Sequence, residues 1–303
     1  MIPSTAPPFG MTRWVAQTQA SYVSATPYNW TLNKVHGFVG TRQPAIWMGD
    51  SGLVGVVPGV LPQGGEVKVG FHERALNIVL DDQGEKQEVV SVGYYSVVLD
   101  DGHGGTVLVE QSASALGSVF FIRRRLTMII LASRVGHLRF TFSPSSDNRP
   151  YIFIEAARPS ILTSTSTNVS YPPGFVSIDG REICGYSSER QDWIITPISQ
   201  SDEAAGFKGY FCARFDFQLE EQSVIIQNGT THHGQKNAEG PLLGAYTFAP
   251  TSSSSQTVID LRVGTSFISI DQARANIDNE IPDSFGVKGM LPTPLLSVVL
   301  TQY

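Results

Sequence analysis

Short segments in which apolar and polar residues alternate recur along the chain, separated by runs of Gly, Pro, Ser and Asn. Such alternation is typical of strands with one buried face, and its recurrence every ~8–12 residues is typical of a sandwich. The segments are Val67–Phe71, Tyr94–Leu99, Thr106–Glu110, His137–Phe142, Tyr151–Glu155, Phe175–Ile178, Tyr210–Phe217, Ser223–Gln227, Ala245–Ala249, Val258–Val263 and Phe267–Ile270. No stretch alternates strands with helices, so we predict an all-β fold, a large antiparallel β-sandwich.

One helix is predicted near the end of this pattern. Ser269 stands three residues before Gln272, which is the spacing of a capping box at a helix start. Ala273, Ile277 and Ile281 follow at intervals of four and would form one apolar stripe. Pro282 comes directly after and would end the helix. The sequence therefore predicts a short C-terminal helix that packs on the sandwich by this stripe.

Two regions do not fit the sandwich pattern. Ala115–Ala132 shows neither clean alternation nor turn residues, and we interpret it as an aberrant insert, since the segments on its two sides read almost continuously without it. Ser284–Tyr303 departs from the pattern of the helix before it and forms a divergent tail. The apolar runs in both are far shorter than the ~20 residues that cross a bilayer, so we expect no membrane partner.

The run Val35–Gly52 combines glycines and a proline with polar and aromatic side chains. Its backbone requirements favour a shaped loop over a regular strand. Such a loop would display Arg42, Gln43, Trp47 and Asp50, and an indole beside planar hydrogen-bonding groups suits the face and hydroxyls of a sugar. The alternative is a tight turn with Trp47 in the core and Asp50 capping the turn.

Composition narrows the remaining chemistry. The formal net charge of −6 gives no reason to expect a nucleic-acid partner. Cys184 and Cys212 lie beside predicted strands and form either a disulfide or two buried thiols. Three acceptor patterns for N-glycosylation start at Asn29, Asn168 and Asn228, and no signal peptide precedes them. The chain contains no catalytic motif and no metal-ligand spacing, so we assign neither catalytic nor metal residues.

An ordered series of segments, beginning with His36–Gly52, resembles the N-terminal domain of glycoside hydrolase family 92, the calcium-dependent exo-acting α-mannosidases, and particularly their fungal α-1,2-type members. The series extends over residues 1–283 apart from Ala115–Ala132. Its other members are Met1–Thr12, His72-Glu73, Tyr94–Val97, Ser133–Phe140, Gly209–Phe215 and Val263–Ser269.

The resemblance implies a galactose-mutarotase-like sandwich that packs on an (α/α)6 catalytic domain, absent from this chain, with the glycan pocket between them. Trp47 would contact the mannose ring, Asp50, Arg42 and Gln43 would bind hydroxyls or order the loop, and His36 and Phe38 would add to the same wall. The catalytic carboxylates and most calcium ligands would belong to the absent domain.

We therefore expect the carbohydrate-binding half of a secretory-pathway α-mannosidase that hydrolyses terminal α-1,2-mannosyl linkages of N-glycans, inactive alone. The alternatives are a non-catalytic carbohydrate-binding module and a nonfunctional truncated product.

Overall fold

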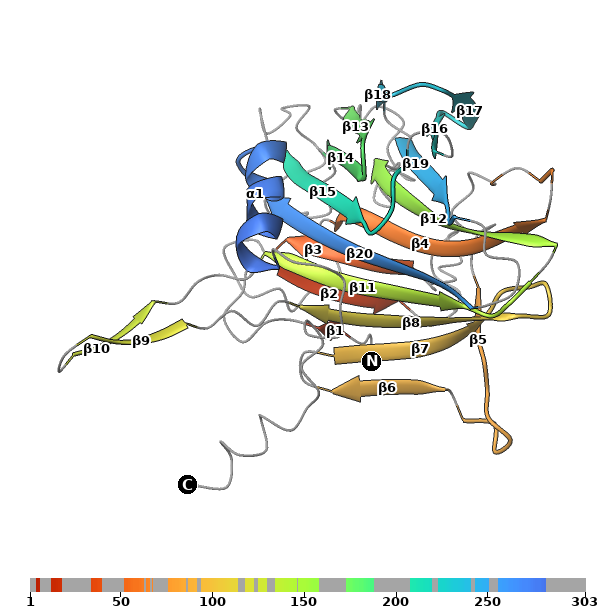
Figure 1. Ribbon diagram of the computed structural model, residues 1–303, viewed down its shortest axis with the longest axis horizontal. Helices are drawn as coiled ribbons and strands as arrows, with labels where there is room; N and C mark the ends of the chain where they lie inside the picture. The colour runs from red at the N-terminus through yellow and green to blue at the C-terminus, as the bar shows by residue number, and fades with distance from the viewer. Residues whose placement is uncertain are drawn as a thin grey trace, which may run out of the picture.

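A computed structural model describes the central and C-terminal parts of the chain most fully (Figure 1). The described residues are 4–5, 12–17, 34–39, 52–62, 64–65, 67, 76–85, 87–91, 94–113, 118–122, 125–129, 134–145, 147–157, 173–187, 208–219, 223–240, 243–250 and 256–281. For the strands before residue 54 and for those between 118 and 129, the description covers the backbone.

Two antiparallel sheets form the body of the molecule, which confirms the predicted all-β sandwich. The first has eight strands in the order β1 (Ser4–Thr5), β2 (Thr12–Gln17), β3 (Lys34–Val39), β4 (Gly52–Pro62), β12 (Asn148–Ala157), β19 (Leu243–Phe248), β16 (Ser223–Gln227) and β17 (Thr230–His233). The second has ten strands in the order β18 (Asn237–Gly240), β13 (Gly174–Asp179), β14 (Glu182–Ser187), β15 (Gly209–Phe215), β20 (Thr257–Ser266), β11 (Val135–Phe142), β8 (Thr106–Ala113), β7 (Tyr94–Asp100) and β5 (Asn77–Ile78), and β6 (Glu88–Ser91) also pairs with β7.

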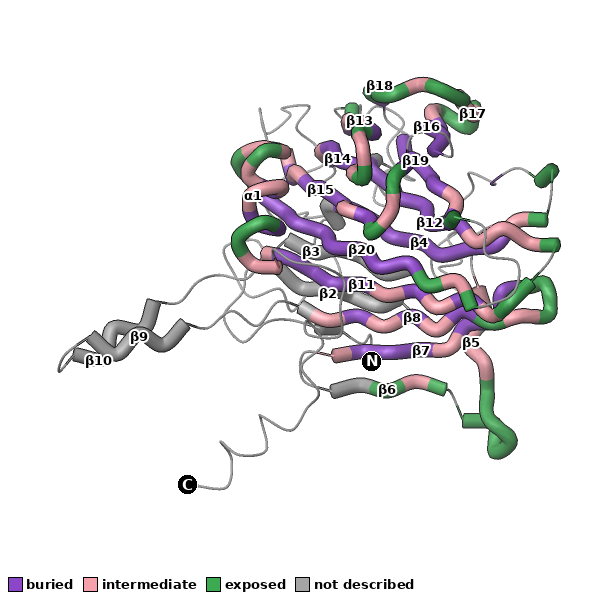
Figure 2. The backbone as a smooth tube through the Cα atoms, in the orientation of Figure 1, coloured by how far each residue is buried: buried purple, intermediate pink, exposed green. Residues whose placement is uncertain are grey.

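The main hydrophobic core lies between the two sheets and follows the alternation in the sequence. In β11, Leu138, Phe140 and Phe142 are buried in this core, while His137 and Arg139 lie on the opposite, outer face of the sheet. Every second residue of a strand points to the same face, so a single segment supplies both the core and an outer polar surface. Figure 2 shows buried positions concentrated along the central strands and exposed ones at the turns.

The outer face of the eight-stranded sheet carries a second apolar cluster. Tyr151, Phe153 and Tyr246 are its largest members, and all three are almost fully buried. Glycines make room for these rings: a Cβ on Gly59 would lie 2.4 Å from the Tyr151 ring, and one on Gly244 would lie 2.3 Å from the Phe153 ring. β12 is therefore buried on both faces and reads as a nearly continuous apolar run.

Helix α1 (Ile270–Glu280) confirms the prediction for the C-terminal segment. Ser269 caps it by accepting a hydrogen bond from the Gln272 backbone N–H at 3.0 Å. Ala273 and Ile277 are fully buried against the outer face of the ten-stranded sheet, with Ile281 partly buried beside them. Within the described part of the chain, no helix is long and apolar enough to span a membrane.

Two strand predictions differ from the structure. Phe267 and Ile268, predicted to continue a strand, lie in the bend that leads from β20 to the Ser269 cap, and Ile270 already belongs to the helix. The strand β4, which contains three glycines and Pro58, was not predicted, because Gly and Pro normally indicate turns. Of the predicted strand Val67–Phe71, only Val67 is described, outside any strand; the rest lies outside the described residues.

The region Ala115–Ala132 contains strand structure that its sequence pattern did not predict. β9 (Ser118–Ile122) and β10 (Arg125–Ile129) form an antiparallel hairpin that pairs with neither large sheet among the described strands (Figure 1). The strands on its two sides, β8 and β11, are direct neighbours and remain paired up to Ala113 opposite Gly136. The hairpin thus interrupts the connection between two strands of the main sheet.

Candidate functional site

The predicted sugar-binding run is divided between two neighbouring strands and the segment that joins them. His36 and Phe38 belong to β3, where they lie opposite Gly55 and Gly52 of β4, so these two residues are in a strand and not in the predicted loop. Their strand assignment follows from pairing with β2 and β4 on both sides, which local Gly content did not reveal. Arg42, Gln43, Trp47 and Asp50 lie outside the described residues. Both ends of the run are nevertheless set on adjacent strands of one sheet.

Within the described part of the chain, a large group of charged side chains lies on the outer face of the ten-stranded sheet. At its centre, Asp260 of β20 accepts two hydrogen bonds from the Arg139 guanidinium, each 2.8 Å long. His137 Nε2 lies 3.2 Å from the same carboxylate. β11 and β20 are paired with Arg139 directly opposite Asp260, so strand register brings these residues together.

The pKa values of two neighbouring aspartates, Asp260 and Asp216, are shifted in opposite directions. Burial alone would raise the pKa of Asp260, but the hydrogen bonds from His137 and Arg139 outweigh it and hold the pKa below its usual value. Burial, together with the charge of Asp260, raises the pKa of Asp216. Neighbouring carboxylates whose pKa values are pushed apart are the pattern of an acid–base pair. Here, however, the lowered member is buried and already bonded to Arg139 and His137, which is the arrangement of a structural ion-pair network.

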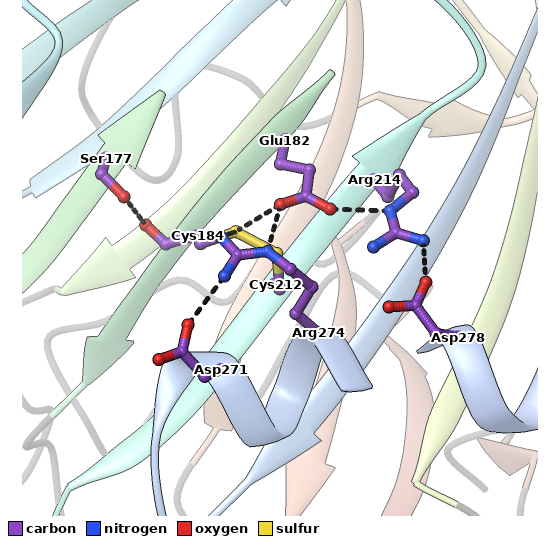
Figure 3. The surroundings of a disulfide bond; sticks show 8 residues. All are labelled: Ser177, Glu182, Cys184, Cys212, Arg214, Asp271, Arg274 and Asp278. Carbon is purple, nitrogen blue, oxygen red and sulfur yellow. Dashed lines mark hydrogen bonds and ion pairs between the residues drawn. A yellow bond between two sulfur atoms is a disulfide. The ribbon is translucent and has the colours of Figure 1, made fainter. Parts of the chain in front are cut away.

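A second charged group surrounds the disulfide between Cys184 of β14 and Cys212 of β15 (Figure 3). These cysteines lie directly opposite each other on paired strands. Glu182 accepts hydrogen bonds from Arg214 Nε and Arg274 Nε, both at 2.7 Å. Arg274 comes from α1, so Glu182 links a sheet strand to the helix.

Two acidic side chains of α1 also form ion pairs with these two arginines. Asp278 accepts from Arg214 Nη1 at 2.5 Å, and Asp271 accepts from Arg274 Nη1 at 2.8 Å (Figure 3). At the far end of the helix, the Glu280 carboxylate accepts from the Arg134 backbone N–H at 2.8 Å. Charged contacts therefore surround the buried Ala273 and Ile277 and fix the position of α1 on the sheet.

The described residues do not fit a calcium site. Calcium takes six to eight oxygen ligands, whereas the described group of three ligand-type side chains is Glu182, Cys184 and Cys212. Its two sulfurs are joined in the disulfide, and its carboxylate is bonded to two arginines that would repel a cation. Among the described residues, this arrangement therefore anchors α1 to the sheet and lacks the oxygen ligands of a calcium site.

Local sequence patterns indicate some members of these networks but not which residues pair. Alternation within His137–Phe142 predicts that His137 and Arg139 share a face. Their partner Asp260 comes from a strand 121 residues away from Arg139, and no local pattern identifies that pairing. Glu182 and Asp278 were missed for the same reason, since their shared partner Arg214 belongs to another element. Asp271 was also missed, although its spacing of three from Arg274 within the predicted helix is a local signal.

The chain matches the family model described as the glycosyl hydrolase family 92 N-terminal domain over residues 1–266. The match ends at Ser266, the last residue of β20, and α1 follows directly. The sequence has no match among curated proteins.

Solved structures with the same fold include an inverting mannosidase of family GH92 from Bacteroides thetaiotaomicron VPI-5482, at 20% identity and a TM-score of 0.61, covering 94% of this chain and 31% of that chain. An α-mannosidase of the family from Bacteroides thetaiotaomicron, at 20% identity and a TM-score of 0.58, matches over 94% of this chain and 33% of its own length. A GH92 glycosyl hydrolase named ccman5 gives 18% identity and a TM-score of 0.57, with 93% and 32% covered. The chain thus spans about a third of the length of these proteins.

Proposed function

Because the chain belongs to glycosyl hydrolase family 92 through its N-terminal domain, we propose that it serves as the sandwich half of an α-mannosidase for terminal α-1,2-mannosyl linkages of N-glycans. In this proposal the sandwich contributes one wall of a mannose pocket, and a second, catalytic domain supplies the acid and base carboxylates together with the calcium ligands. The substrate class is supported by the mannosidases that share this fold.

The observation that carries the proposal is the placement of the run between β3 and β4. Its two ends are adjacent strands of a packed sheet, with Phe38 opposite Gly52. A binding loop whose ends are held by such a scaffold keeps its side chains in a defined position. In the proposed pocket, Trp47 stacks on the mannose ring, and Asp50, Arg42 and Gln43 meet its hydroxyls.

The proposed inactivity of the sandwich alone follows from the chemistry of an inverting glycosidase. Such an enzyme needs a general acid and a general base about 6.5–9.5 Å apart on either side of the sugar. The pKa of Asp260 is held below its usual value by Arg139 and His137, which favours the ionised form and opposes a role as general acid. Both carboxylate oxygens of Glu182 are already occupied by Arg214 and Arg274. We therefore assign both to the stability of the ten-stranded sheet and of α1.

The test measures binding and hydrolysis of α-1,2-mannobiose by the full chain. We expect weak binding, near the millimolar level or ~4 kcal/mol, and no release of mannose. Trp47→Ala should abolish binding and Asp50→Asn should weaken it. Phe267→Ala, which removes a 40% exposed ring from the bend before α1, is the matched control and should bind normally.

The result separates the alternatives. Release of mannose by the chain alone would overturn the half-enzyme assignment. Binding that survives Trp47→Ala would remove the run from the pocket. If the Trp47-dependent binding occurs but a companion catalytic domain adds no hydrolysis, the chain is a carbohydrate-binding module.

A further inference from the structure

The turn between β16 and β17 presents an asparagine in an acceptor sequence. Asn228 and Gly229 form the two-residue connection of this hairpin, with Gln227 paired to Thr230. Their φ values are 49° and 83°, so both adopt left-handed backbone conformations. Asn-Gly is the preferred pair for such a turn, because Asn tolerates the left-handed region and Gly adopts it freely. The backbone alone therefore explains Asn and Gly here, but it does not explain Thr230.

Thr230 completes the tripeptide Asn-Gly-Thr, which is an acceptor for N-glycosylation. Asn228, Gly229 and Thr230 are all exposed. Within the part of the chain that the structure describes, the Asn228 side chain makes no hydrogen bond. A Cβ built on Gly229 meets nothing within 4 Å, so the space around the turn is open. The amide of Asn228 is thus available to an enzyme that approaches from solvent.

The base of the hairpin is fixed even though its tip is open. Gln227 donates a hydrogen bond of 2.6 Å from its side-chain Nε2 to the Glu239 carbonyl, which ties β16 to β18. β17 ends the eight-stranded sheet and pairs only with β16 among the described strands. A sheet edge of this kind offers unpaired backbone groups to other chains, and bulky or charged groups at an edge prevent such pairing. A glycan on Asn228 would stand beside this edge.

We propose that Asn228 is an N-glycan attachment site. The proposal rests on the proposed function, together with the secretory-pathway location that the sequence leads us to expect. The Cys184–Cys212 disulfide supports that location, since disulfides persist in oxidising compartments. The donor is a lipid-linked pyrophosphate oligosaccharide. The Asn228 Nδ2 attacks C1 of its first N-acetylglucosamine, the bond from C1 to the pyrophosphate oxygen breaks, the lipid pyrophosphate leaves with the electron pair, and Nδ2 releases a proton.

The test expresses the full chain behind a cleavable secretory leader in a glycosylating host. In a host that makes only high-mannose N-glycans, endoglycosidase H leaves one N-acetylglucosamine on each modified asparagine, and peptide mass spectrometry locates it. This remnant is a better marker than conversion of Asn to Asp, because Asn-Gly sequences deamidate spontaneously. We expect the remnant on the Asn228 peptide of the wild-type chain and of Thr230→Ser, and its loss in Asn228→Gln and Thr230→Ala. Asn237→Gln, which changes an exposed asparagine without an acceptor sequence, should retain it.

Leader cleavage and the Cys184–Cys212 disulfide establish that the chain entered the oxidising compartment. A chain that carries the disulfide but has no remnant at Asn228 would overturn the proposal while leaving the mannosidase assignment intact. A chain that is glycosylated at Asn228 but shows no Trp47-dependent binding of mannobiose would support the glycosylation proposal and contradict the mannosidase assignment. Retention of the remnant in Thr230→Ala would contradict the role assigned to the Thr230 hydroxyl in the acceptor sequence.

Discussion

The two outer faces of the sandwich are buried by different means. On the eight-stranded sheet, the outer face is covered by aromatic and aliphatic packing around Tyr151, Phe153 and Tyr246. On the ten-stranded sheet, it carries ion pairs such as Arg139–Asp260 and is covered at one end by α1. Both faces come from strands with the same period of two, so their difference lies in the kind of side chain that occupies the outward positions.

This difference predicts different sensitivities to mutation. An apolar cover depends on shape, so removing volume leaves a cavity whose surroundings relax only in part. A charged cover depends on complete pairing, so removing one partner leaves the other buried without compensation. The two faces should therefore respond most strongly to different substitutions, and five experiments test this, from the largest expected effect to the smallest.

Phe153→Ala should cause the largest loss. The ring is 2% exposed and packs on the outer face of the eight-stranded sheet, above Gly244. Truncation of a buried Phe costs about 3–5 kcal/mol of unfolding free energy, measured by urea denaturation. Phe267→Ala, at a 40% exposed ring, should change it by less than about 0.5 kcal/mol. Similar losses in the two variants would show that the apolar outer face is not closely packed.

Asp260→Asn tests the charged face. The change keeps the volume but removes the charge that neutralises Arg139, so we expect a loss of about 2–3 kcal/mol of unfolding free energy, below the full cost of breaking a buried pair because Arg139 is partly exposed. Asp81→Asn, in an exposed turn, is a control for the loss of one negative charge on a surface aspartate. If Asp260→Asn lowers the unfolding free energy no more than this control does, the ion-pair network contributes little to stability.

The opposite pKa shifts of Asp260 and Asp216 predict how the unfolding free energy depends on pH. The folded-state pKa of Asp260 is lowered, so its contribution is present above the unfolded pKa of ~3.9 and is lost as the pH falls through the folded pKa. The difference between wild type and Asp260→Asn should therefore shrink below pH ~4. Asp216 has a raised pKa, so its contribution is present at low pH and is lost as the pH rises through that pKa. Asp216→Asn should be neutral or stabilising near neutral pH, and a large destabilisation there would contradict this sign.

The comparison also shows which parts of the structure could be predicted from sequence. The sandwich, most of its central strands and α1 were predictable, because alternation and the Ser269 cap are local signals. β4 was not, because pairing with β3 and β12 overrides its Pro58 and its glycines. Asp260 and Glu182 could not be placed, since their partners come from distant strands or from α1. The roles of Trp47 and Asp50 remain predictions, because both lie outside the described residues.

Gly264→Ala tests how α1 covers the charged face. A Cβ at this position of β20 would lie 2.2 Å from the Ala273 carbonyl oxygen and 2.8 Å from Ile277 Cγ1. The backbone of the helix cannot yield locally as a flexible side chain would, so α1 must shift, at a cost of about 2 kcal/mol. Hydrogen exchange should increase in α1 and much less in β12. Gly240→Ala adds a methyl group to β18 of the same sheet, where the atoms near the new Cβ belong to the flexible Gln227 side chain, and it controls for general effects of the added methyl. Exchange that rises equally in α1 and β12 would mean that the helix and the sheet unfold together.

Deletion of Ala115–Ala132 should have the smallest effect, and in the opposite direction. The hairpin β9–β10 pairs with neither sheet among the described strands, so we expect it not to cover the outer face that α1 covers. Its removal leaves Ser114, Ser133, Arg134 and Val135 between Ala113 and Gly136, which are already opposite each other in β8 and β11. Shortening this connection lowers the entropy cost of closing it by about 1.5 kcal/mol, so the melting temperature should rise. A fall in melting temperature would show instead that the hairpin stabilises the sandwich by packing on it, as the aromatic cluster and α1 do.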